Sequence, residues 1–182
     1  MKLRGWFRKD KRHSALEQWR NDWAAAISGN GSGGSDLRAR LDALSATEPD
    51  VEIELEMLDA LDQLHELRQA LANGGLPSVE TQHRVIGAEA CHFTAPASMP
   101  TDQSQSSGRV LLTRSRAVFV GPGRTSATAW HMVHDVARIE RDVVFVRGDK
   151  SAAAHFRFNN YADAIVCAFL AERLKPAPRG RL

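Results

Sequence analysis

Cysteine is scarce in this chain, and long apolar runs are missing. The two cysteines, Cys91 and Cys167, are too few for a disulfide scaffold and indicate a reducing compartment. The longest apolar run, residues 164–171, has eight residues, and the first thirty residues contain no apolar stretch long enough for a signal core or a membrane span. We therefore expect a cytoplasmic protein.

The rest of the composition is that of an ordinary globular protein. With 182 residues, 43% of them hydrophobic and 25% charged, the chain is long enough to bury a core without disulfides or metal, and wholesale disorder is excluded. The net charge of +2 is too small for the whole molecule to attract nucleic acid or acidic lipid. Charge is nevertheless segregated along the chain: seven Lys or Arg against three Asp or Glu over 1–35, three against ten over 36–75, and fourteen against nine over 76–182.

Residues 1–13 form a basic, aromatic tail in which six Lys or Arg and one acid alternate with Leu3 and an aromatic pair. Three interpretations fit this composition. A frayed terminus is the default. A lipid-interface peptide would insert the aromatic side chains and set the cations against anionic headgroups. A nucleic-acid arm would use the same groups, and we do not favour it. The candidate lipid- or anion-binding residues here are Lys2, Arg4, Trp6, Phe7, Arg8 and Lys9.

Residues 14–75 are expected to be helical. Ser14 followed by Glu17 is a capping box and predicts a helix start, after which Leu16, Trp19, Trp23 and Ile27 recur on one face, as core residues do. A Gly/Ser linker at residues 29–35 ends this helix and is expected to act as a hinge. A short helix over 36–44 follows, with Ser35 as its expected cap.

A longer helix is predicted from about residue 50, just after Pro49, to Ala72. Its apolar residues recur at intervals of four and three, which is the pattern of a packing seam. The seam residues are Ile53, Met57, Leu64, Leu67 and Leu71. Packing within the chain is favoured because sustained coiled coils show more heptads; pairing with another copy or another protein, as in an assembly subunit, is the alternative.

Beyond residue 84 the apolar period changes to two and predicts seven short strands. Their expected ranges are 88–94, 109–113, 117–120, 125–130, 136–140, 143–147 and 152–158. An amphipathic helix over 161–174, capped by Asn159 or Asn160 and stopped by Pro176, closes this part, and residues 176–182 form a tail. We thus expect an α+β fold, with N-terminal helices followed by a seven-stranded antiparallel barrel or sandwich and a C-terminal helix.

Four ordered pieces of the C-terminal part carry a family resemblance. They are GAEACHF at 87–93, GRVLLTRSRAVFVG at 108–121, WHMVHDVARIER at 130–141 and HFRF at 155–158. Together they resemble bacterial PH-like and GRAM-like domains, whose pattern is G-E, then G-x-L-x-L-T-x-x-R-L-x-F-x-G, then W-x-x-I-x-x-V, then F-x-F before the helix. The resemblance covers residues 84–175 and implies the pleckstrin-homology superfold. It leaves the N-terminal half unexplained.

The resemblance also bears on ligands. Members that bind phosphoinositides carry a Lys/Arg cluster around the first hairpin, because a multiply phosphorylated headgroup needs several cationic donors. The corresponding connection here, residues 95–107, contains no Lys or Arg, which argues against high-affinity inositide binding. Arg114, Arg116 and Arg124 near the next two turns are candidates for a weaker anionic patch, although solvated hairpin tips are the simpler interpretation.

No catalytic constellation emerges. His131 and His134 beside Asp135 lack the further ligand and the helical context of a zinc site, so a metal-dependent hydrolase is an alternative of low weight. Cys91 and His92 are adjacent on a strand and point to opposite faces. We therefore predict no metal, no cofactor and no enzyme. The expected function is a binding or scaffold protein with a protein partner, with contact to a membrane surface and homo-oligomerisation as open alternatives.

Overall fold

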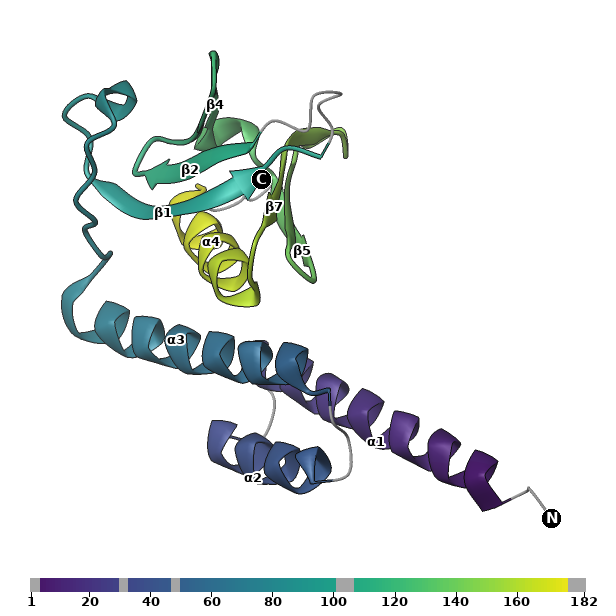
Figure 1. Cartoon of the computed structure of the whole chain (residues 1–182). Coiled ribbons are helices and arrows are strands. Elements are labelled where there is room, and N and C mark those ends of the chain that lie inside the picture. The colour runs from purple at the N-terminus through teal and green to yellow at the C-terminus, as the bar shows by residue number, and fades with distance from the viewer. Residues whose placement is uncertain (1–3, 30–32, 47–49, 101–106, 177–182) are drawn as a thin grey trace, which may run out of the picture. The chain divides into compact units, whose positions relative to one another are not determined.

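The structure is a computed structural model, and it describes residues 4–29, 33–46, 50–100 and 107–176, with side chains from Ala15 onward. The chain divides into two compact units, Met1–His65 and Glu66–Leu182. Helices α1 (Arg4–Ile27), α2 (Gly34–Ser45) and α3 (Glu52–Gly74) precede an antiparallel sheet and a last helix, as Figure 1 shows. The α+β class predicted from the sequence is confirmed. Lys2, Pro49 and residues 177–182 of the predicted tail lie outside the described residues.

Two predicted helix starts are wrong. Helix α1 begins at Arg4 and not at Ser14, because Arg4–His13 has no proline and contains five Lys or Arg, which are good helix formers; the Ser14–Glu17 pair therefore lies inside the helix. Helix α2 begins after Gly33, whose extended backbone ends the preceding segment, and no side chain caps it. Ser35 lies in the first turn of α2 instead of before it.

The first unit, Met1–His65, is called the helical unit and the second, Glu66–Leu182, the sheet unit. The helical unit is built around two tryptophans. The side chains of Trp19 and Trp23 are buried. The indole N–H of Trp19 donates to the backbone oxygen of Leu37 at 2.8 Å, and that of Trp23 donates to the backbone oxygen of Met57 at 2.6 Å. Each ring therefore fills core volume while its one polar atom is satisfied. The prediction that the stripe on α1 is core is confirmed.

Seven strands form one antiparallel sheet in the order β4-β3-β2-β1-β7-β6-β5. Their bounds are β1 Cys91–Ser98, β2 Ser107–Thr113, β3 Arg116–Gly121, β4 Arg124–Ala129, β5 Asp135–Ile139, β6 Asp142–Val146 and β7 Ala152–Phe158. Single turns of 3-10 helix lie at η1 (Arg84–Ile86) and η2 (Trp130–Met132). The predicted strands fall on these within one or two residues, except the first. Strand β1 starts and ends later than 88–94, because the alternating inward residues Phe93, Ala95 and Ala97 extend its buried face.

Helix α4 (Tyr161–Leu174) has the bounds expected from the sequence. Asn160 caps it, since its side-chain oxygen accepts the N–H of Asp163 at 2.7 Å. Its apolar face joins the inward aromatic side chains of the strands in a single core; the aromatic members are Phe93, Phe119, Trp130, Phe145, Phe156 and Phe158. This arrangement, a seven-stranded antiparallel sheet with a C-terminal helix packed on it, is consistent with the PH-like topology.

The hairpin of β2 and β3 also explains one glycine of the family-like pattern. A Cβ atom on Gly108 would lie 2.3 Å from the backbone oxygen of Val120 and 2.7 Å from the ring of Phe119. Strands β2 and β3 approach too closely there for any side chain.

Among the helices that the structure describes, none is long and apolar enough to cross a membrane.

Candidate functional site

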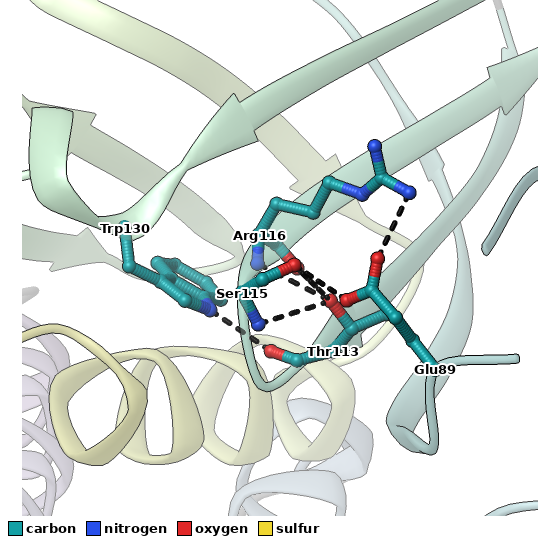
Figure 2. Close-up of polar contacts among 5 residues, drawn as sticks. All are labelled: Glu89, Thr113, Ser115, Arg116 and Trp130. Atoms are coloured by element: carbon teal, nitrogen blue, oxygen red, sulfur yellow. Dashed lines mark hydrogen bonds and ion pairs between the residues drawn. The ribbon is translucent and has the colours of Figure 1, made fainter. Parts of the chain in front are cut away.

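Three of the four sequence pieces that carry the family resemblance meet at the turn between β2 and β3, which Figure 2 shows in close-up. Thr113 ends β2, and its hydroxyl donates to the backbone oxygen of Arg116 at 3.0 Å while accepting the backbone N–H groups of Ser115 and Arg116 at 3.3 and 3.2 Å. Threonine in this position reproduces backbone turn bonds with its side chain. The two-residue turn Arg114–Ser115 is thus fixed from within.

Glu89 reaches this turn from the segment before β1. Its carboxylate accepts the Ser115 hydroxyl at 2.5 Å and pairs with the Arg116 guanidinium at 2.9 Å. The hydrogen bond from Ser115 is the largest cause that lowers the pKa of Glu89 below its usual range, and Arg116 adds to the effect. The turn and the incoming chain are therefore joined by an ionised carboxylate.

Trp130 holds the turn from the opposite side. Its indole N–H donates to the backbone oxygen of Thr113 at 2.9 Å, and its backbone N–H donates to the backbone oxygen of Ser115 at 3.1 Å. The buried ring packs edge-on against Phe145, with centroids 5.5 Å apart. Glu89, Thr113, Arg116 and Trp130, which come from three of the four pieces of the pattern, consequently belong to one network.

The chemistry of this network is structural. The hydroxyl of Ser115 donates to a carboxylate that already holds an arginine, so nothing in the network takes a proton from the hydroxyl to make it a nucleophile. Its groups satisfy one another and fix a turn. Glu89, Thr113 and Trp130 thus contribute to one network that holds the turn in place.

The three candidate arginines of the anionic patch do not come together. Arg114 is exposed at the β2–β3 turn, and Arg116 is paired with Glu89. Arg124 pairs with Gly121 at the opposite end of β3. The five residue steps from Arg116 to Gly121 put about 16 Å of strand between the two sites. Three cations spread in this way cannot converge on one phosphate group.

The seam residues of α3 have different surroundings. Met57 and Leu64 are buried, while Ile53 is 46% exposed. Leu67 and Leu71 are half-buried and pack against the core of the sheet unit. Four of the five side chains are thus buried or half-buried. Of the N-terminal candidates, Arg4, Trp6, Phe7, Arg8 and Lys9 lie in the backbone of α1, and their side chains, like all of Lys2, are outside the described part.

The groups considered for metal or thiol chemistry stay apart. His131 lies in η2, and His134 precedes β5; both side chains are exposed. Among the described residues, no three His, Cys, Asp or Glu side chains gather as a metal site would require. Both cysteines are buried, and burial raises the pKa of each thiol, so neither is a ready nucleophile.

The outer edge of β4 is a feature that sequence reasoning missed. Strand β4 ends the sheet and, among the described residues, pairs only with β3, to which the two-residue turn Pro122–Gly123 joins it. Pairs in an antiparallel ladder alternate between bonded and non-bonded, and the pair that flanks a two-residue turn is bonded. The backbone groups of Arg124, Ser126 and Thr128 therefore face β3, and those of Thr125, Ala127 and Ala129 face away from the sheet. In the described part of the chain, these three make no backbone hydrogen bond on that side.

The other end of the sheet is closed in a way that β4 is not. The backbone N–H of Val136 on β5 donates to the Glu172 carboxylate of α4 at 3.1 Å and to Asp135 at 2.9 Å. The ammonium of Lys175 donates to the backbone oxygen of His134 at 3.0 Å. Side chains at the end of α4 and just after it thus bind two backbone groups at the start of the β5 edge. Strand β4 has no proline, no register shift and no lysine, which are devices that usually protect an edge.

The comparisons with known proteins add little. No protein-family model matches the chain, and no curated protein matches it. One solved structure, described as the crystal structure of the C-terminal domain of an unknown protein from Leishmania infantum, is similar with a TM-score of 0.42 and 8% sequence identity, over 61% of this chain and 96% of that one. Nothing about function follows from a likeness at this level.

Proposed function

We propose that this chain is a non-enzymatic binding protein, and that its C-terminal domain, of the bacterial PH-like or GRAM-like kind, contacts a protein partner. The observation that carries the proposal is the outer edge of β4. Among the described residues, the outward N–H and C=O groups of Thr125, Ala127 and Ala129 have no backbone partner, while on the opposite edge the N–H of Val136 donates to Glu172 of α4. An extended segment that adds to such an edge gains main-chain hydrogen bonds.

Two further observations favour a protein over a phosphoinositide as the ligand of this domain. The candidate arginines are divided between the two ends of β3, and one of them is neutralised by Glu89. The small side chains of β4, Thr125, Ser126, Ala127 and Thr128, leave room for a neighbouring backbone at strand spacing. The edge therefore suits a peptide backbone better than a cluster of phosphates.

The test is photo-cross-linking in cells with the full chain. A photoreactive residue replaces Thr125 on the edge, or the exposed Lys150 at the β6–β7 turn as a matched control. We expect a discrete protein adduct from position 125 that is lost when Ala127→Pro is added, because proline removes only an outward N–H there. Equal adducts from both positions, or adducts that persist with Ala127→Pro, would overturn the proposal.

A second contact, with anionic lipid, is proposed for the N-terminal segment. Helix α1 runs back to Arg4, so the basic and aromatic residues of this segment share a helical backbone, which interfacial anchors require. Flotation with vesicles that contain phosphatidylserine tests it. The full chain is expected to float at low salt, whereas a chain without residues 1–13 stays in the soluble fraction; equal recovery of both would reject lipid contact.

A further inference from the structure

The edge of β4 has a property that points to a particular partner. Its outward residues, Thr125, Ala127 and Ala129, are spaced evenly about Ala127. When two such edges approach in antiparallel fashion about a twofold axis at Ala127, each outward residue of one copy faces an outward residue of the other. Thr125 then lies opposite Ala129 of the second copy, and Ala127 lies opposite its own counterpart.

We infer that β4 pairs with β4 of a second copy of this chain, which continues the seven-stranded sheet across a twofold axis. The inference rests on the proposed function, because it names the partner of the same edge. It is the isologous arrangement that closed dimers use, in which one patch is complementary to itself.

The side chains of β4 permit this pairing. Its single charge, Arg124, lies at the end of the strand; in the twofold register it faces residue 130 of the second copy, so no two like charges are opposed. Thr125 and Ala127 are exposed, and none of the side chains from Thr125 to Ala129 is larger than threonine.

The size of the contact sets its strength. One six-residue strand covers much less than the roughly 800 Å² per partner of a standard interface. The dimer is therefore expected to be weak and concentration-dependent, and a covalent trap is more sensitive than a sizing column.

The register can be tested with cysteine. In a bonded antiparallel pair the Cα atoms are about 5.5 Å apart, within the range that a disulfide spans. Purified Ala127→Cys is therefore expected to form a disulfide-linked dimer under mild oxidation. Thr125→Cys is the matched control, because the two copies of residue 125 are then about 14 Å apart along the strands. The native Cys91 and Cys167 are buried and do not compete.

Solution measurements complete the test. Sedimentation equilibrium of the full chain is expected to show a monomer–dimer equilibrium that Ala127→Lys shifts to monomer, because two lysines would face each other, and that Ala127→Val strengthens. Circular dichroism checks that each variant is folded. Dimers with Thr125→Cys as abundant as with Ala127→Cys, or a chain that stays monomeric at all concentrations, would overturn self-pairing.

The two proposals fail in different ways. If purified Ala127→Cys does not cross-link but the photoreactive residue at 125 captures another protein in an Ala127→Pro-sensitive manner, self-pairing is wrong and the proposed function stands. If neither the purified chain nor the chain in cells forms an edge-dependent adduct, both are wrong.

Discussion

Thr113 makes more hydrogen bonds in this domain than its small side chain would suggest. Its hydroxyl makes three hydrogen bonds with backbone groups of the β2–β3 turn, and its backbone oxygen accepts the indole N–H of Trp130. Glu89 then ties the turn to the chain that enters the sheet. A turn held in this way pairs Arg116 with a carboxylate of the same chain, and Arg114 is the cation that lies at the turn itself.

Removing the Glu89 carboxylate should weaken the domain in a pH-dependent manner. Because hydrogen bonds lower the pKa of Glu89, its stabilisation is fully present above the unfolded pKa, near 4.3, and is lost as pH falls through the lower folded value. Glu89→Gln is expected to cost about 1 kcal/mol or less at pH 7, since the site is partly exposed. Urea unfolding at pH 7 and pH 3 measures the difference between the two proteins.

Glu80→Gln, an exposed change, is the control for this experiment. Asp142, whose pKa is also lowered, chiefly by Arg157, titrates equally in all variants and cancels. A cost for Glu89→Gln that is the same at pH 3 as at pH 7 would contradict the assigned role.

At the scale of the element, helix ends and strand edges determine which backbone groups remain available to another molecule. Glu172 and Lys175 at the end of α4 bind backbone groups at the start of β5, and no side chain is seen to do this on the outer edge of β4 among the described residues. In the helical unit, α1 contacts α3 through a buried acid: Glu54 is 1% exposed and accepts the guanidinium N–H of Arg20, at 2.8 Å from Nε. An acid that is buried in this way needs its partner.

Breaking that pair should destabilise the helical unit. Arg20→Met leaves the Glu54 carboxylate buried without its cation and is expected to cost about 2–4 kcal/mol, less than a fully buried pair because Arg20 is 46% exposed. The double variant Arg20→Met with Glu54→Met removes both charges and should recover most of the loss. Helical circular dichroism during urea unfolding measures both, and a double variant as weak as Arg20→Met would argue against the pair.

The sequence predicted most elements, because their signals are local. The period of two, the Asn160 cap and the proline after α4 each act within a few residues, and α4 was predicted with its observed bounds. The start of α1 was missed because a capping box at Ser14 says nothing about whether the basic residues before it are helical. The β4 edge was missed because an unpaired edge depends on strand order, and no single strand encodes that order. Once the strand order is known, the two-residue turn Pro122–Gly123 determines that the backbone groups of Ala127 face away from the sheet.

At the scale of the whole molecule, the sheet unit owes its stability to one aromatic core. Phe156 lies between Phe119 and Phe145, with ring centroids 6.1 and 5.4 Å away, and is 2% exposed. Removal of a ring that is enclosed in this way leaves a cavity that the surrounding side chains cannot fill. The candidate arginines, in contrast, lie at the two ends of β3, and this separation depends on how the strands pair in the sheet.

Phe156→Ala is therefore expected to cost about 3–5 kcal/mol of unfolding free energy. Val144→Ala, a half-buried change on the neighbouring strand, is the control and should cost far less. Chemical denaturation followed through the sheet signal in circular dichroism compares the two. Equal losses would mean that Phe156 is not enclosed as described.

The buried indole at the β2–β3 turn has a practical consequence for such measurements. Of the four tryptophans, Trp6, Trp19 and Trp23 belong to the helical unit, and Trp130 is the one in residues 66–182. The tryptophan fluorescence of the whole chain will thus report mainly on the unfolding of the helical unit. A fluorine label on the indoles separates the signals, and the resonance assigned to Trp130 then follows the melting of the sheet alone, in the intact chain and without truncation.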